Sequence, residues 1–142
     1  MDHLKEAGIS LLRHYRVNPI HDAVMFDIDS TLIFPNGDAN KPIIELAREA
    51  HNMNYNVVII TARPHWMEYV TRHELMRYGI PYDVLKLCDY DMKGDMKKLL
   101  GYNFVLSVGD IWEDLTETKP VSYTHLRAHE TLRYLVCRLL LE

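Results

Sequence analysis

The residues with the clearest chemical potential are two aspartates that directly follow an apolar run. The run Ala23–Phe26 is typical of a buried strand, and Asp27 and Asp29 stand at its carboxyl end. Ligands of open α/β sheets bind at this end of the strands. Two neighbouring carboxylates repel each other unless a cation or a shared proton offsets their charge. The pair therefore indicates a metal site.

Further polar residues follow the other predicted strands, or begin the helix before one of them. They are Thr61 and Arg63 after the run 57–60, Gly109, Asp110 and Asp114 after the run 104–108, and Lys93 at a predicted helix start. Because the carboxyl ends of parallel strands lie along one edge of a sheet, we expect these side chains to converge.

Each converging side chain suits one part of a phosphoryl transfer. A carboxylate such as Asp27 can attack phosphorus and divide one displacement into two steps. Asp29 can protonate the leaving alkoxide and then deprotonate the hydrolytic water. Lys93 offsets the acids and stabilises the transferring group, and Thr61 offers a hydroxyl to a phosphoryl oxygen.

The same edge supplies hard oxygen ligands for Mg²⁺. We expect Asp27, Asp110 and the backbone carbonyl of Asp29 to hold the ion. Asp114 either ligates it directly or orients metal-bound water. The alternative for Asp114 is a plain acidic residue in the first turn of a helix.

Four short motifs at these positions resemble those of the haloacid dehalogenase superfamily of phosphohydrolases. The motifs are Asp27-Ile28-Asp29-Ser30-Thr31, Thr61, Lys93, and Gly109-Asp110 with Asp114. The segments 93–99 and 109–115 are similar to the acid-phosphatase branch. The resemblance covers residues 20–116.

The resemblance implies a Mg²⁺-dependent phosphomonoester hydrolase that acts through an aspartyl-phosphate on Asp27. It implies catalytic roles for Asp27, Asp29, Thr61 and Lys93, substrate contacts for Thr31, Thr61, Arg63 and Lys93, and a metal site formed by Asp27, Asp29, Asp110 and Asp114. The short interval between Thr31 and a helix predicted from Lys41 leaves no room for a large cap domain, so we expect an open site.

Alternatives remain for several of these assignments. Arg63 contacts either the substrate or a structural ion-pair partner. Lys93 is preferred over Lys97 and Lys98, which are interpreted as a solvated helix face. The function is either hydrolysis of a small phosphorylated substrate, hydrolysis of a phosphate exposed on a larger molecule such as a nucleotide or polynucleotide 3′-phosphate, or binding without turnover.

Periodicity predicts a doubly wound parallel α/β sheet with helices on both faces. We expect strands at 23–28, 57–60, 82–87 and 104–108, alternating with helices at 41–52, 64–78 and from 91 or 93 to 100, after an N-terminal helix at 3–15. Such alternation is typical of βαβ units with all strands parallel.

Composition excludes some functional classes. The 142 residues carry a formal net charge of −4, which makes nucleic acid an unfavoured partner. No apolar run is long enough to span a membrane. The start of the chain lacks a signal-peptide pattern and there are only two cysteines, so we expect a cytoplasmic protein. The oligomeric state is left open.

The pattern of the last 22 residues indicates that they do not share the origin of the preceding chain. Residues 121–142 resemble a translated sequencing adapter with a variable index, although leucines at helical spacing also fit an amphipathic helix. We therefore expect an N-terminal helix within 1–20, a phosphatase-like core at 21–120 that is truncated after its fourth strand, and an artefactual tail at 121–142.

Overall fold

The computed structural model describes residues 2–110 and 112–118. The N-terminal half contains α1 (Asp2–His14), β1 (Asp22–Phe26), α2 (Lys41–Asn52) and β2 (Asn56–Thr61). After these come η1 (His65–Met67), α3 (Glu68–Arg77), β3 (Val84–Leu87), η2 (Tyr90–Met92), α4 (Lys93–Leu100), β4 (Asn103–Val108) and α5 (Trp112–Leu115). The predicted tail at 121–142 lies outside the described residues.

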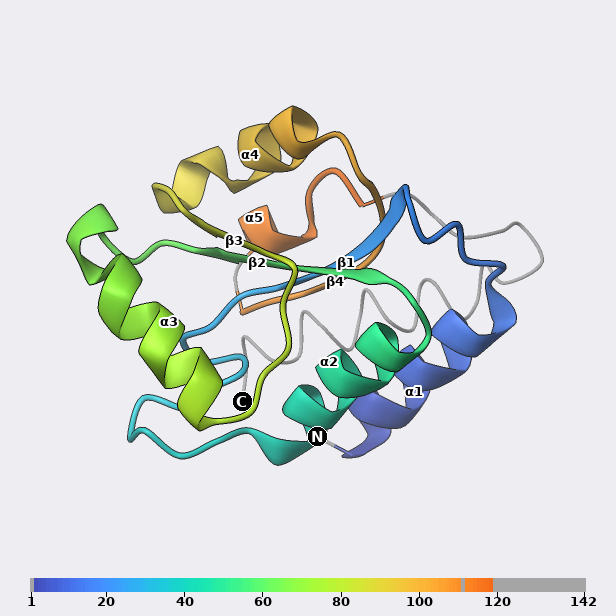
Figure 1. Cartoon of the computed structure of the whole chain (residues 1–142), viewed down its shortest axis with the longest axis horizontal. Helices are drawn as coiled ribbons and strands as arrows, with labels where there is room; N and C mark the ends of the chain where they lie inside the picture. Colours follow the sequence, from blue (N-terminus) through green and yellow to red (C-terminus); the bar gives the residue numbers. More distant parts are fainter. Residues whose placement is uncertain (1, 111, 119–142) are drawn as a thin grey trace.

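The four strands form one parallel sheet in the order β3-β2-β1-β4. Figure 1 shows the strands running through the middle of the molecule, with helices on either side. Because all strands run the same way, their carboxyl ends lie along a single edge. The predicted doubly wound α/β fold is confirmed.

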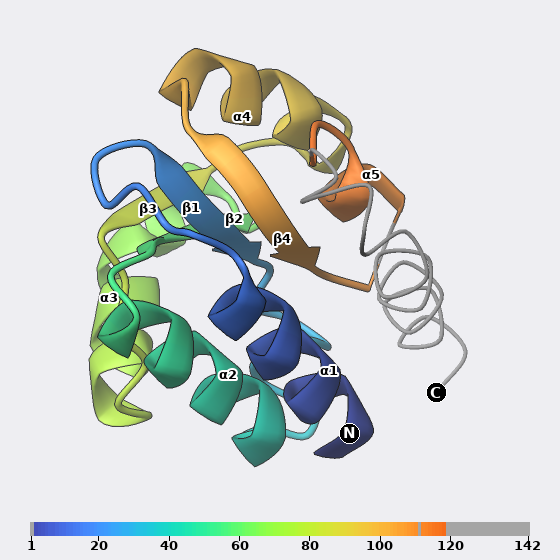
Figure 2. The ribbon, with the colours of Figure 1, turned by 90° about the vertical axis from the view of Figure 1, so that its right-hand side faces the viewer.

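Two apolar layers cover the two faces of the sheet. Alternate residues of β1 and β2, such as Val24 and Val57, pack with α1 and α2 in the larger core. Their neighbours, such as Met25 and Val58, pack with α4 in a smaller core. Figure 2 shows α1 and α2 below the sheet and α4 above it. Burial on both faces explains why these strands are continuously apolar.

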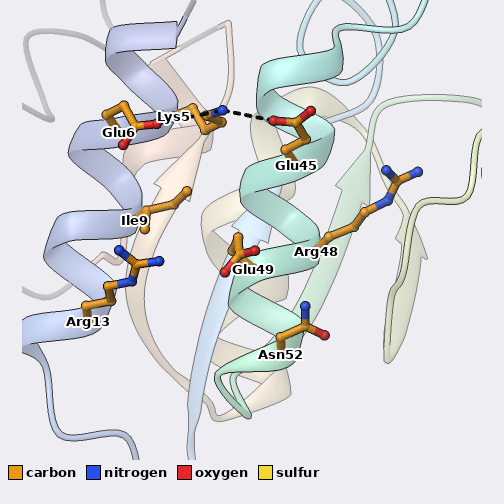
Figure 3. A pocket seen from close by; sticks show the side chains of 8 residues that line it. All are labelled: Lys5, Glu6, Ile9, Arg13, Glu45, Arg48, Glu49 and Asn52. Atoms are coloured by element: carbon orange, nitrogen blue, oxygen red, sulfur yellow. Dashed lines mark hydrogen bonds and ion pairs between the residues drawn. The ribbon is translucent and has the colours of Figure 1, made fainter.

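Helices α1 and α2 pack closely against each other. A side chain at Gly8 would come within 2.9 Å of Leu46, so the glycine permits the approach. Lys5 Nζ binds Glu45 Oε2 across the pair at 2.9 Å (Figure 3). A groove of about 310 Å³ lies beside this ion pair, and none of the converging acids lines it.

Candidate active site

The loop after β1 turns sharply and places the first aspartate beside β4. The backbone N–H of Asp27 donates to Val108 O at 3.0 Å, although β1 itself ends at Phe26. Ile28 O then accepts three backbone N–H groups, including that of Ile33 at 3.1 Å. The first strand is therefore shorter than the predicted 23–28, because this turn uses the groups that a strand would pair.

Three carboxylates meet at the carboxyl ends of β1 and β4. Oxygen atoms of Asp27, Asp110 and Asp114 lie within 4.8 Å of one another. Asp27 is 6% exposed and Asp114 is 0% exposed, whereas Asp110 is half-buried. Clustered carboxylate oxygens are the ligands that hard divalent cations prefer. This trio can hold such an ion.

Lys93 faces two members of the trio from the first residue of α4. Its Nζ lies 3.0 Å from Asp27 Oδ1 and 2.7 Å from Asp114 Oδ1, and the residue is 1% exposed. A cation at a helix N-terminus opposes the helix dipole, so helix stability does not explain this lysine. Burial lowers its pKa, but the two carboxylates outweigh that effect and raise the pKa overall.

The surroundings of Asp27 disfavour its charged form. Burial raises the pKa of the Asp27 carboxyl well above its ordinary value. Lys93 opposes the shift, while repulsion by Asp114 and a hydrogen bond with Asp110 add to it. The site thus holds three carboxylates and one ammonium, which contacts two of them, and a bound cation would shift Asp27 toward its ionised form.

Gly109 makes room for the last acid of the trio. A Cβ atom at Gly109 would lie 2.1 Å from Asp114 Oδ2, which is far inside van der Waals contact. The Gly-Asp pair in the sequence therefore has a steric basis. Any side chain at Gly109 displaces the carboxylate of Asp114.

Asp29 belongs to a second, more exposed network. Arg63 binds it with two parallel contacts, Nη2 to Oδ1 at 2.8 Å and Nε to Oδ2 at 3.1 Å. The same guanidinium contacts Glu74 Oε1 at 2.9 Å and Thr71 Oγ1 at 3.1 Å on α3. Arg63 therefore forms ion pairs in the structure, and its contact with a substrate stays a prediction. The carboxylate of Asp29 stands outside the acid trio.

The two predicted threonines are both fully buried. Thr61 ends β2, and its Oγ1 accepts the backbone N–H of Arg63 at 3.3 Å. Thr31 lies in the loop after β1, where its carbonyl accepts Asn40 Nδ2 at 2.8 Å. Within the described residues its hydroxyl has no hydrogen-bond partner.

One buried residue was misassigned from the sequence. Lys97 is 1% exposed, so its interpretation as part of a solvated helix face is wrong. Lys98 does fit that interpretation, since its side chain is 63% exposed. The available signal was spacing, because Lys97 follows Lys93 by one helical turn and shares its face. Burial lowers the pKa of Lys97 to about 7.

Helices that could cross a membrane are absent from the described part of the chain.

Comparisons with known proteins bear on the fold. No protein-family model matches the chain, and no curated protein matches it. A solved chain of the Pnkp1/Rnl/Hen1 RNA repair complex is similar, with 23% identity, a TM-score of 0.57, and coverage of 71% of this chain and 40% of that chain. A second chain, from a Pnkp1/Rnl/Hen1 complex, has 26% identity over 48% of this chain and 28% of that chain, with a TM-score of 0.46. The chain thus spans well under half the length of these structures, and the first likeness establishes a shared fold.

Proposed function

We propose that the protein hydrolyses phosphomonoesters with a divalent cation, through a covalent phosphate on Asp27. The observation that carries the proposal is the meeting of Asp27 with Lys93, Asp110 and Asp114 at one sheet edge. A buried carboxylate beside a lysine and two further acids has the parts that covalent phosphoryl transfer requires. The motif resemblance to haloacid dehalogenase phosphohydrolases agrees with this chemistry.

The side chains divide the reaction between them. Asp27 attacks phosphorus, the ester P–O bond breaks, and Asp29 gives its proton to the leaving alkoxide. Asp29 then takes a proton from water, which attacks the aspartyl-phosphate, releases inorganic phosphate and regenerates the Asp27 carboxylate. Lys93 stabilises the transferring group.

The ion that best fits the site is Mg²⁺. Asp27, Asp110 and Asp114 would hold it, together with the backbone carbonyl of Asp29. Its charge would stabilise the negative phosphoryl oxygens. Phosphate contacts by Thr31 and Thr61 remain predictions. Arg63 acts in this proposal by orienting the Asp29 carboxylate, with which it makes two contacts; one of these contacts opens when Asp29 carries a proton.

Turnover of an aryl phosphate in the presence of Mg²⁺ tests the mechanism. We expect Asp27→Asn to lower kcat by at least about 10⁴-fold, because loss of a nucleophile removes the covalent route. Asp91→Asn is the control, since Asp91 is an exposed acid on η2. Undiminished turnover by Asp27→Asn contradicts the mechanism. A wild-type chain that binds Mg²⁺ and phosphate without turnover indicates a binding module instead.

A second candidate substrate is a nucleotide or polynucleotide 3′-phosphate. Trp66 and Tyr69 are 79% and 82% exposed and follow Arg63 closely in the chain. Exposed aromatic rings are platforms on which bases stack. The similar RNA repair complex is in keeping with this candidate, and it gives no support to the expectation that nucleic acid is an unfavoured partner.

Substrate comparison separates these candidates. A 3′-phosphorylated oligoribonucleotide with a higher kcat/KM than an aryl phosphate favours the polynucleotide. Equal or lower kcat/KM favours a small substrate.

A further inference from the structure

A buried lysine outside the acid trio holds the segment that carries Asp114. Lys97 Nζ donates to Asp114 O at 2.6 Å, to Thr116 O at 2.7 Å and to Ser107 Oγ at 2.8 Å. Thr118 Oγ1 lies farther away, at 3.4 Å. In its charged form the amine has three protons, so the three short contacts use its full donor capacity.

Asp114 is thereby held at both ends from one helix. Lys93 binds its carboxylate, and Lys97, one turn later on α4, binds its backbone carbonyl. Residues four apart on a helix lie on the same face. The two lysines of α4 therefore fix both the position of the Asp114 backbone and the direction of its side chain.

The segment around Asp114 has little structure of its own to fix this position. Helix α5 is four residues long, and a helix of one turn is unstable without tertiary contacts. Lys97 joins it to β4 through Ser107, whose hydroxyl also pairs with Thr118. An apolar side chain at position 97 would remove this shared donor from a buried site.

We infer that Lys97 is a positioning residue for the cation site: by fixing the backbone of residues 114–118 against β4, it sets where the Asp114 carboxylate meets Asp27 and Asp110. The inference rests on the proposed cation site of the phosphatase and adds a residue to it. Changes to groups that orient metal ligands typically cost about 10- to 100-fold in metal affinity.

Binding of Mn²⁺ to the full chain without substrate, followed by electron paramagnetic resonance, tests this inference. We expect Lys97→Met to weaken Mn²⁺ binding by about 10- to 100-fold. Lys98→Met is the matched control on the same helix, because its side chain is 63% exposed, and it should bind as the wild type does. Circular dichroism at the binding temperature establishes that each variant is folded.

Ser107→Ala provides a second, milder variant in case Lys97→Met does not fold. It removes one of the three short contacts, so we expect a smaller loss of affinity in the same direction. Added Mg²⁺ should restore turnover of Lys97→Met, which a purely structural role would not predict. Wild-type affinity in folded Lys97→Met, or in Ser107→Ala where Lys97→Met is unfolded, overturns the inference.

The outcomes also separate this inference from the proposed function. A wild-type chain that binds no Mn²⁺ contradicts the cation site and the inference together. A wild-type chain that binds Mn²⁺ without phosphatase activity contradicts only the proposed function. Equal binding by wild type and folded Lys97→Met contradicts only the role of Lys97.

Discussion

Asp27 and Asp29 are two residues apart in one loop, yet they lie in opposite surroundings. Asp27 is 6% exposed and shares a lysine with Asp114, whereas the side chain of Asp29 is 61% exposed and is bound by an arginine. Burial raises the pKa of Asp27. Environment, rather than residue type, can therefore give two neighbouring carboxylates different properties, and the mechanism proposed above also assigns them different roles.

The two cations differ in shape and in the exposure of their partners. Lys93 is a buried point charge between two acids, and Arg63 is a planar group that spans the loop after β1 and helix α3. Removing one partner from a buried ion pair leaves an uncompensated charge, while exposed pairs contribute little to stability. The comparison predicts large effects on stability at Lys93 and smaller ones at Arg63, whose acidic partners are more exposed.

The largest effect is expected from Lys93→Met. It leaves Asp27 and Asp114 buried without their cation, and we expect the free energy of unfolding to fall by about 3–5 kcal/mol. Urea denaturation without divalent cations measures the change, with Lys98→Met as the exposed control on α4. A loss no greater than that of the control would remove the contrast between the two networks.

An intermediate effect, here a gain in stability, is expected from Asp27→Asn. A raised carboxyl pKa in the native state contributes stability that is present below the unfolded-state pKa, about 3.9, and is lost as pH rises through the native pKa. The amide does not titrate, so without divalent cations the melting temperature of Asp27→Asn should exceed that of wild type at pH 7.

The same difference should vanish near pH 4, where Asp27 of the native protein holds its proton. Thermal unfolding across this pH range measures the difference, and Asp95→Asn serves as the control because Asp95 is an exposed acid on α4. If the difference in melting temperature between wild type and Asp27→Asn does not change with pH, titration of Asp27 does not cause it.

The smallest effect on stability is expected from Arg63→Lys. Lysine keeps the charge but cannot make the two parallel contacts to Asp29. We expect a smaller change in unfolding free energy than at Lys93, because lysine keeps the charge and the Asp29 side chain is 61% exposed, although that of Arg63 is only 10% exposed. Turnover should still fall, since Asp29 loses its fixed orientation. Arg72→Lys is the control on α3.

A loss of stability at Arg63 as large as that at Lys93 would contradict the comparison. So would unchanged turnover, because it would mean that Asp29 needs no orientation by Arg63.

The fold and the meeting of the acids were accessible from sequence for one physical reason. Strands buried on both faces are continuously apolar, so β1, β2 and β4 are recognisable, and a parallel sheet gathers whatever follows them. That logic predicts the neighbourhood of Asp27, Asp110 and Lys93. The similar solved chain shares this fold.

Other features depend on contacts between elements and leave little trace in sequence. Lys97 stands in a short helix among Lys93, Asp95 and Lys98, where charge suggests solvent. Its burial arises only when the segment after β4 folds back over α4. Similarly, the sequence does not show that Arg63 forms an ion pair. The pair forms because the loop that carries Asp29 lies close enough to α3 for one guanidinium to contact both Asp29 and Glu74.

Gly109 gives a way to compare this chain with distant relatives. Aspartates are common after strands, so a match at Asp110 and Asp114 alone is weak evidence of a shared site. A side chain at Gly109 would overlap the carboxylate of Asp114. A relative that keeps both acids but has alanine at this position must seat its last acid elsewhere. Among chains that have the same acidic residues, a glycine at position 109 therefore distinguishes those that can adopt this arrangement of carboxylates from those that cannot.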